Sequence, residues 1–158
     1  MDSNNPYEAP ASAILDVQGD TGLPVFRTSG IYIATFMGSI LAGGWVLAIN
    51  HDALGQHDLA RKARWSGLAG IITVVVLSLL LPEKIPGVVY LIPQMAVVSY
   101  WLKQTLQGDA IAARVAAGLP MRSNWVAAGI GLLAVLALMA VAVLVVAIAI
   151  YGFGVEFA

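Results

Sequence analysis

Long apolar stretches alternate with short polar ones along this chain. The apolar stretches lie at about residues 30–50, 66–81, 87–102 and 124–151. Twenty helical residues rise about 30 Å, which matches the hydrocarbon thickness of a bilayer. No charged residue lies between Gly30 and Asn50 or between Trp125 and Val155. The pattern predicts an all-α fold, with a bundle of about four transmembrane helices within residues 29–158.

The polar residues before the first apolar stretch form a separate region. Residues 1–28 include Pro6, Pro10 and Pro24 and show no hydrophobic period. Segments that bury little apolar surface do not fold alone, so we expect a disordered tail. The turn-like run from Asn5 to Tyr7 leaves open a second interpretation, in which this tail is a docking peptide for a partner.

Two further polar segments connect the later spans. Residues 82–86 hold two prolines and predict a sharp turn between the second and third spans. Residues 103–124 form a longer connection, in which Leu106 and Ala110 begin a run with helical spacing. We therefore expect a short surface helix along the membrane between the third and fourth spans.

Composition agrees with a membrane protein and excludes several function classes. Apolar residues make up 59% of the chain and charged residues only 11%, against about 25% charged in soluble domains. The mean hydropathy is +0.85. The net charge of -1 argues against nucleic acid as a partner, and the absence of cysteine excludes disulfides, zinc–thiolate sites and cysteine nucleophiles. The predicted partner is the lipid bilayer, and no cofactor or metal is predicted.

Small residues recur at helical spacing in the first apolar stretch. Such residues let helix backbones approach closely in lipid, where packing drives association. We interpret them as a helix-packing face for other membrane proteins or for self-association. One row, four residues apart, is Gly30, Ala34, Gly38 and Ala42, and a second pair beside it is Ser39 and Gly43.

Basic residues predict the orientation. Lys and Arg near membrane ends favour the cytoplasmic side. Arg27 and Lys84 fall outside the two longer polar loops, so we place both loops in the cytoplasm and both chain termini outside. The loop cations also suit anionic lipid headgroups, an interpretation compatible with the topological one. These six residues are Arg61, Lys62, Arg64, Lys103, Arg114 and Arg122.

Few polar groups lie inside the predicted spans. Pro93 and Gln94 are adjacent in the third span; the amide either bonds to backbone freed by a kink or lines a narrow polar path. His51 and His57 are each followed by aspartate, which fits a metal site or, as we expect, a solvated loop. No catalytic motif is present, so we do not expect an enzyme.

Three stretches carry a resemblance to a known group of proteins. They are the NPYxxP-type start at residues 4–10, the glycine-rich first span with its basic turn at 36–63, and the linker into the last span at 106–132. In these stretches, under half of the chain, it resembles uncharacterised small bacterial inner-membrane proteins. The resemblance implies a multipass inner-membrane protein and carries no catalytic residues. We expect a structural or accessory role through helix–helix contacts; the alternative is a small transporter or channel component with a path near Gln94.

Overall fold

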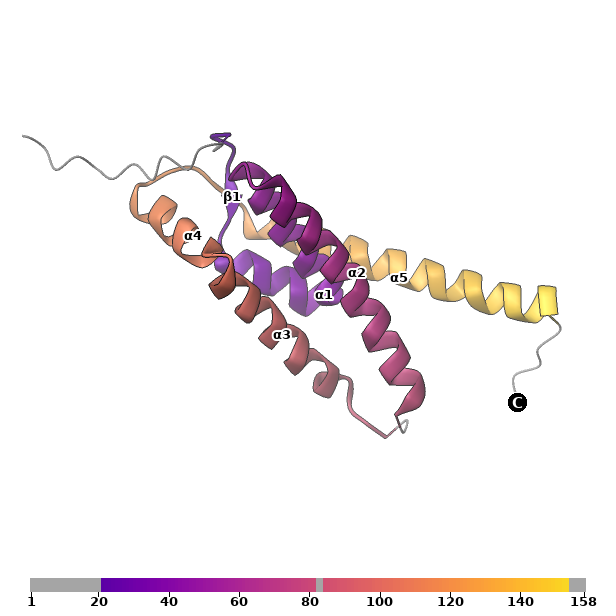
Figure 1. The fold of residues 1–158 in the computed structure, drawn as a ribbon. Helices are drawn as coiled ribbons and strands as arrows, with labels where there is room; N and C mark the ends of the chain where they lie inside the picture. The colour runs from indigo at the N-terminus through magenta and orange to yellow at the C-terminus, as the bar shows by residue number, and fades with distance from the viewer. Residues whose placement is uncertain (1–20, 82–83, 154–158) are drawn as a thin grey trace, which may run out of the picture.

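The computed structural model describes residues 21–81 and 84–153, and it is mainly helical (Figure 1). Five helices make up 82% of these residues. Beside them lies one pair of short parallel strands, in which Val25 pairs with Met121 and Phe26 with Arg122. In chain order the elements are β1 (Val25–Phe26), α1 (Thr28–Ala53), α2 (His57–Leu80), α3 (Gly87–Gln104), α4 (Gln107–Ala116), β2 (Met121–Arg122) and α5 (Asn124–Phe153).

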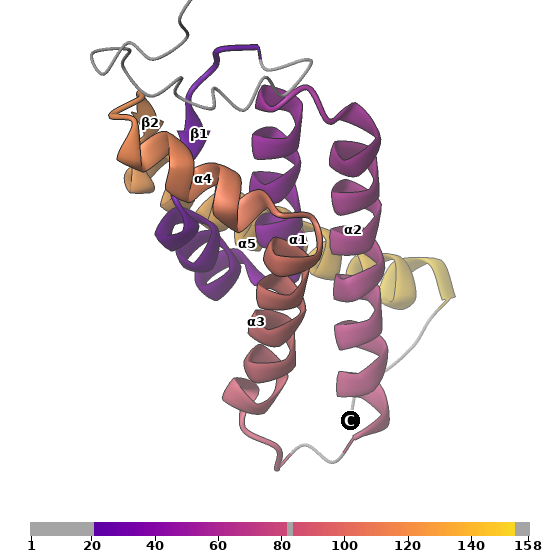
Figure 2. The same ribbon diagram turned by 60° about the vertical axis from the view of Figure 1, so that its left-hand side comes forward.

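Helix α1 is the centre of the molecule, because α2, α3 and α5 all pack against it. It is also broken. Gly38 (φ -118°, ψ 18°) and Ser39 (φ 66°, ψ -177°) have non-helical backbone angles. The break divides α1 into a first half, residues 28–37, and a second half, residues 40–53. The two halves run in different directions in Figure 2.

The two halves of α1 form a hairpin that returns to its starting end. The side chain of Asn50 accepts a hydrogen bond from the Phe26 N–H at 2.7 Å and donates one to the Phe26 carbonyl at 3.0 Å. The Thr21 hydroxyl donates to the Ala53 carbonyl at 2.9 Å. In a straight helix, residues 24 apart would be about 36 Å from each other. The chain therefore reverses at Gly38 and Ser39.

This reversal changes the meaning of the first apolar stretch. Three described helices are long and apolar enough to cross a membrane by length and composition, namely α1, α2 and residues Asn124–Gly152 of α5. Helix α1 reaches that length only by joining its halves, which measure about 15 Å and about 21 Å. Neither half matches the roughly 30 Å of a bilayer core. The predicted first span at 30–50 thus does not run from one end of the molecule to the other.

The same reversal places the N-terminal residues at an end that the sequence did not predict. Residues 21–27 lie beside the turn between α1 and α2, together with α4 and β2 (Figure 2). We call this end of the molecule the polar end. The turn between α2 and α3 lies at the opposite end. Residues 21–27, which were expected on the opposite side from the first basic loop, therefore lie beside that loop in the structure.

Part of the predicted tail is ordered. Val25 and Phe26 are fully buried and form β1, where a disordered segment was expected. Burial of two large apolar side chains offsets the entropy of ordering the strand. The docking segment from Asn5 to Tyr7 lies outside the described residues.

Helices α2 and α3 follow one another around the predicted turn in the middle of the chain, but each packs on α1 rather than on the other, and α2 begins earlier than expected. It starts at His57 rather than near residue 66, so the first basic loop is largely helical. Asp58 lies in the first turn, where a carboxylate complements the helix dipole, and it pairs with Arg61 one turn later at 3.0 Å. The start of the intervening turn, residues 82–83, lies outside the described residues.

Helix α4 lies in the predicted connection between α3 and α5, and the residues it buries are not those of the run with helical spacing that begins at Leu106. Leu106 is 66% exposed. The buried face consists of Gln107, Ile111 and Arg114. Gln107 donates to the Leu47 carbonyl at 3.1 Å, so a polar contact with α1 fixes the rotation of α4.

Helix α5 runs across α2 and α3 in both views instead of lying parallel to them (Figures 1 and 2). Its first turns pack on the first half of α1, where Gly30 faces Asn124 and Ala127. Beyond about residue 135 most of its described side chains are exposed. The bundle is therefore built around α1, with α5 crossing it obliquely.

Candidate functional site

Five of the six predicted helix-packing residues are buried around the break in α1, and the sixth, Ser39, is half-buried, although the six do not share one continuous helical face. Gly30 and Ala34 belong to the first half, whereas Ala42 belongs to the second. A Cβ atom on Gly38 would lie 2.5 Å from the Gly131 carbonyl oxygen. The backbones of α1 and α5 therefore touch at Gly38 and Gly131, which only glycine permits.

The predicted second pair, Ser39 and Gly43, works within α1. Gly43 lies directly against Thr35 of the first half, so its missing side chain lets the hairpin close. The backbone angles of Ser39, φ 66° and ψ -177°, fall in a region that is essentially restricted to glycine. Its hydroxyl oxygen is buried and has no hydrogen-bond partner among the described residues. The break is therefore a strained point.

A further close contact, which was not predicted from the sequence, joins α1 to α2. A Cβ atom on Gly44 would lie 2.8 Å from the Ala63 carbonyl oxygen and 2.9 Å from Gly67 Cα. The available signal was the glycine pair of α2, Gly67 and Gly70, which lies within the predicted second span at 66–81.

Gln94 caps the second half of α1. Its side-chain oxygen accepts a hydrogen bond from the Ile40 N–H at 2.8 Å, and its side-chain nitrogen donates to the Tyr90 carbonyl at 2.7 Å. The carbonyl that loses its helical partner to Pro93 is that of Val89, so the Gln94 amide does not bond to it. Both amide atoms have backbone partners, which fits a cap better than the lining of a polar path.

A groove lies beside this break. It has a volume of about 440 Å³. Ser39 and Gln94 are its polar side chains, and the rest of the lining is apolar. The lining residues are Phe36, Met37, Ser39, Gly87, Val88, Leu91, Gln94 and Val135.

At the polar end, His51 is fully buried rather than solvated as expected. Its Nδ1 lies 2.7 Å from the Gln56 side-chain oxygen, and its Nε2 accepts a hydrogen bond from the Trp101 indole N–H at 3.1 Å. This pairing assigns the proton of the neutral ring to Nδ1. His51 thus links the end of α1 to α3.

The second histidine lies apart from the first. His57 is exposed and lies 3.1 Å from Asp52. Within residues 21–81 and 84–153, no group of three or more His, Cys, Asp or Glu side chains is arranged to hold a metal ion.

Two of the six basic residues assigned to lipid headgroups have a structural task. Arg122 donates to the Pro24 carbonyl at 2.9 Å, and its guanidinium lies 5.4 Å from the Phe26 ring centre. Arg114 is buried and donates to the Leu23 carbonyl at 3.1 Å. These two arginines hold the segment before α1.

The other four basic residues are accessible at the polar end. Lys62 and Lys103 are exposed. Arg61 pairs with Asp58, and Arg64 pairs with Asp52.

Comparison with known proteins assigns neither fold nor site. No family model matches this chain, and no curated protein or solved structure is significantly similar to it.

Proposed function

We propose that this chain is an integral membrane protein with a structural or accessory role, exerted through contacts between α5 and a helix of a partner or of a second copy. One observation carries the proposal. Helix α5 has 30 residues and is about 45 Å long, yet only its first turns pack within the chain. The remainder offers a long apolar surface of the kind by which helices associate in lipid.

The outer part of α5 is apolar all round. Val141, Val145 and Ile148 lie on one face, and Val143 and Val146 lie on the opposite face. All five are exposed by 45–68%. Lipid covers such a helix, and a partner helix would occupy one face only.

We further propose a topology with three crossings. Helices α2, α3 and α5 cross the membrane, and the hairpin α1 enters and leaves on one side. At 18 residues α3 is about 27 Å long, which reaches the lower end of the spanning range, although it is less apolar than the three helices named above. Helix α5 is about 45 Å long, so it spans a bilayer core of roughly 30 Å only when its tilt stays below about 45°. Helix α4 would then lie at the membrane surface.

Charge supports the assignment of the polar end to the cytoplasm. The chain has eight Lys and Arg residues, and all but Lys84 lie at the polar end, since Arg27 joins the six loop residues there. This asymmetry agrees with the positive-inside tendency. The proposed location is a bacterial inner membrane, with residues 21–27 inside and the end of α5 outside.

The alternative function is a small transporter or channel component with a path near Gln94. The groove beside Ser39 favours it. The engaged amide of Gln94 weighs against it, because the groove keeps only one hydroxyl as an uncommitted polar group. We therefore prefer the accessory role.

Cysteine crosslinking in native membrane tests the accessory role, because the chain has no cysteine of its own. Single cysteines replace Val141, Val145 or Ile148 in one set, and Val143, Val146 or Ile150 in the matched set on the opposite face. We expect crosslinked adducts from one set only, with the helical period. Equal background yields from both sets would show that lipid alone surrounds α5 and would reject the role.

Labelling with a membrane-impermeant maleimide tests the topology separately. Cysteines at Leu23 and Asp109 should react from the same side, and a cysteine at Lys84 from the other. If the cysteines at Leu23 and Lys84 reacted from the same side, the proposed topology, in which α1 enters and leaves the membrane on one side, would be rejected.

A further inference from the structure

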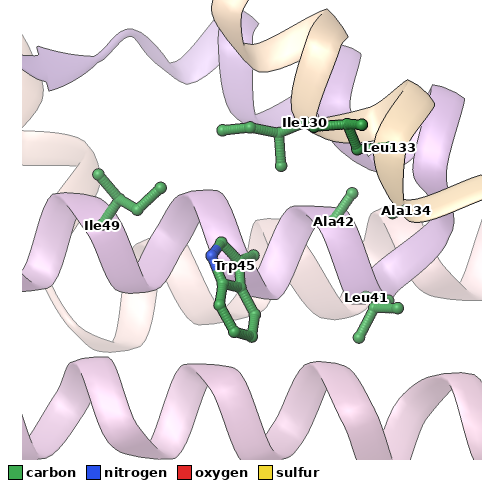
Figure 3. A pocket seen from close by; sticks show the side chains of 7 residues that line it. All are labelled: Leu41, Ala42, Trp45, Ile49, Ile130, Leu133 and Ala134. Carbon is green, nitrogen blue, oxygen red and sulfur yellow. The ribbon is translucent and has the colours of Figure 1, made fainter. Parts of the chain in front are cut away.

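Two furrows meet at Trp45 on the outer surface of α1. The first, the α1–α5 furrow, has a volume of about 360 Å³. Figure 3 shows its lining, with Trp45 on α1 and with Ile130 and Leu133 on α5. The second, the α1–α2 furrow, has a volume of about 380 Å³ and shares Leu41 and Trp45 with the first. The half-exposed Trp45 side chain thus belongs to both furrows.

The α1–α2 furrow changes from basic to apolar along its length. On α2 its lining residues are Arg61, Arg64, Trp65 and Leu68. Their spacing of three, four and seven residues places them on one helical face. The arginines lie nearest the polar turn, and Leu68 lies about a turn deeper. The α1–α5 furrow is lined by apolar side chains throughout.

The two arginines remain accessible to an anion. The side chain of Arg61 is 71% exposed and that of Arg64 is 40% exposed. Each has one carboxylate partner, but a guanidinium has five N–H donors, so donors remain for a phosphate. The Arg64 guanidinium also lies 5.8 Å from the Trp45 ring centre, which holds it over the point where the furrows meet.

We propose that this surface is a binding site for one anionic phospholipid of the leaflet that faces the polar end. The phosphate group lies on Arg61 and Arg64, and the two acyl chains lie on either side of Trp45, one in each furrow. From the polar end inward, the site presents first the two arginines, then Trp45 and then apolar side chains. A bilayer has the same order, from headgroups through the interface to acyl chains. This proposal rests on the proposed membrane location of the protein, but it does not depend on a partner helix for α5.

Lys62 supplies a matched control. It lies between the two arginines in sequence, is exposed, and does not line either furrow. A site explained by general attraction of cations to an anionic surface would depend on Lys62 and Arg61 equally. The proposed site depends on Arg61 alone of this pair.

Native mass spectrometry measures the preference for anionic lipid. The full chain is released from micelles that contain equal amounts of phosphatidylglycerol and phosphatidylcholine. We expect one phosphatidylglycerol bound in preference to phosphatidylcholine. Arg61→Gln should lower this preference roughly fivefold, and Lys62→Gln should leave it within twofold. No preference in the wild-type chain, or equal losses in the two variants, would overturn the proposal.

A second pair of measurements tests the acyl chains. Leu68→Trp narrows the α1–α2 furrow and leaves every cation in place, and it should lower retention of phosphatidylglycerol. Soluble glycerol phosphate at millimolar concentration should not displace the lipid, because it has no acyl chain to occupy a furrow. Unchanged retention in Leu68→Trp, or displacement by glycerol phosphate, would show a simple phosphate site and would contradict the lipid assignment. Either result leaves the crosslinking test of α5 unaffected.

Discussion

The side-chain oxygen of Gln94 lies 2.8 Å from the backbone nitrogen of Ile40, across the break in α1. These residues are 54 positions apart in the chain. The first N–H groups of a helix have no partner within it, and Ile40 begins the second half of α1 inside an apolar bundle. Gln94 supplies the missing acceptor, so α3 stabilises the reversal at the centre of the fold.

Replacing Gln94 should therefore destabilise the protein. Gln94→Leu leaves the Ile40 N–H buried without an acceptor, which costs about 1–3 kcal/mol. The matched control is Gln104→Leu at the exposed last turn of α3, where we expect a change within about 0.5 kcal/mol. Denaturant unfolding in detergent micelles measures both. Equal effects of the two changes would contradict the capping role.

The contact between α1 and α5 can be tested with two glycines of α5. A methyl group on Gly131 would lie 2.9 Å from Met37 Cβ and 3.1 Å from the Ala34 carbonyl oxygen, whereas one on Gly129 would meet no atom within 4 Å. Gly131→Ala should cost about 1–3 kcal/mol through overpacking. Gly129→Ala should be neutral or stabilise the helix by up to about 1 kcal/mol. Thermal unfolding in micelles gives the comparison, and a neutral Gly131→Ala would reject the close packing.

Ser39 offers a change that should stabilise the protein. Ser39→Gly relieves a backbone conformation that suits glycine and removes a buried hydroxyl without a partner. We expect a gain of about 1 kcal/mol in the free energy of unfolding. Ser78→Gly, at an exposed position inside α2, should instead cost about 0.5–1 kcal/mol. A loss of stability in Ser39→Gly would mean that the hydroxyl has a bonding role, such as contact with a bound molecule.

Sequence patterns located most helices because each depends on local composition. The start of α5 follows from Ser123, whose hydroxyl accepts the Trp125 N–H at 3.2 Å as a cap. The turn between α2 and α3 follows from its prolines. The early start of α2 was not predicted, because the charged residues of its first turns have the same low hydropathy as a polar loop.

The site was predicted as residue types and not as an arrangement. Gly38 was identified as a packing residue, but its neighbour Gly131 lies far along the chain, in the last helix. Arg114 and Arg122 were predicted as headgroup cations from their charge alone, and their hydrogen bonds to the carbonyls of Leu23 and Pro24 were not predicted. Such partners depend on how distant segments meet, and no local pattern encodes that.

The sequence by itself determined that the chain is mainly helical and contains segments apolar enough for a bilayer, because those properties follow from local hydropathy and helix length. The tertiary structure alone decided that α1 turns back at Gly38 and Ser39. A break in an apolar helix costs hydrogen bonds and backbone strain, and nothing within residues 30–50 offsets that cost. Gln94 of α3, Gly131 of α5 and the pairing of Asn50 with Phe26 do so together, and each contact exists only once the chain has folded.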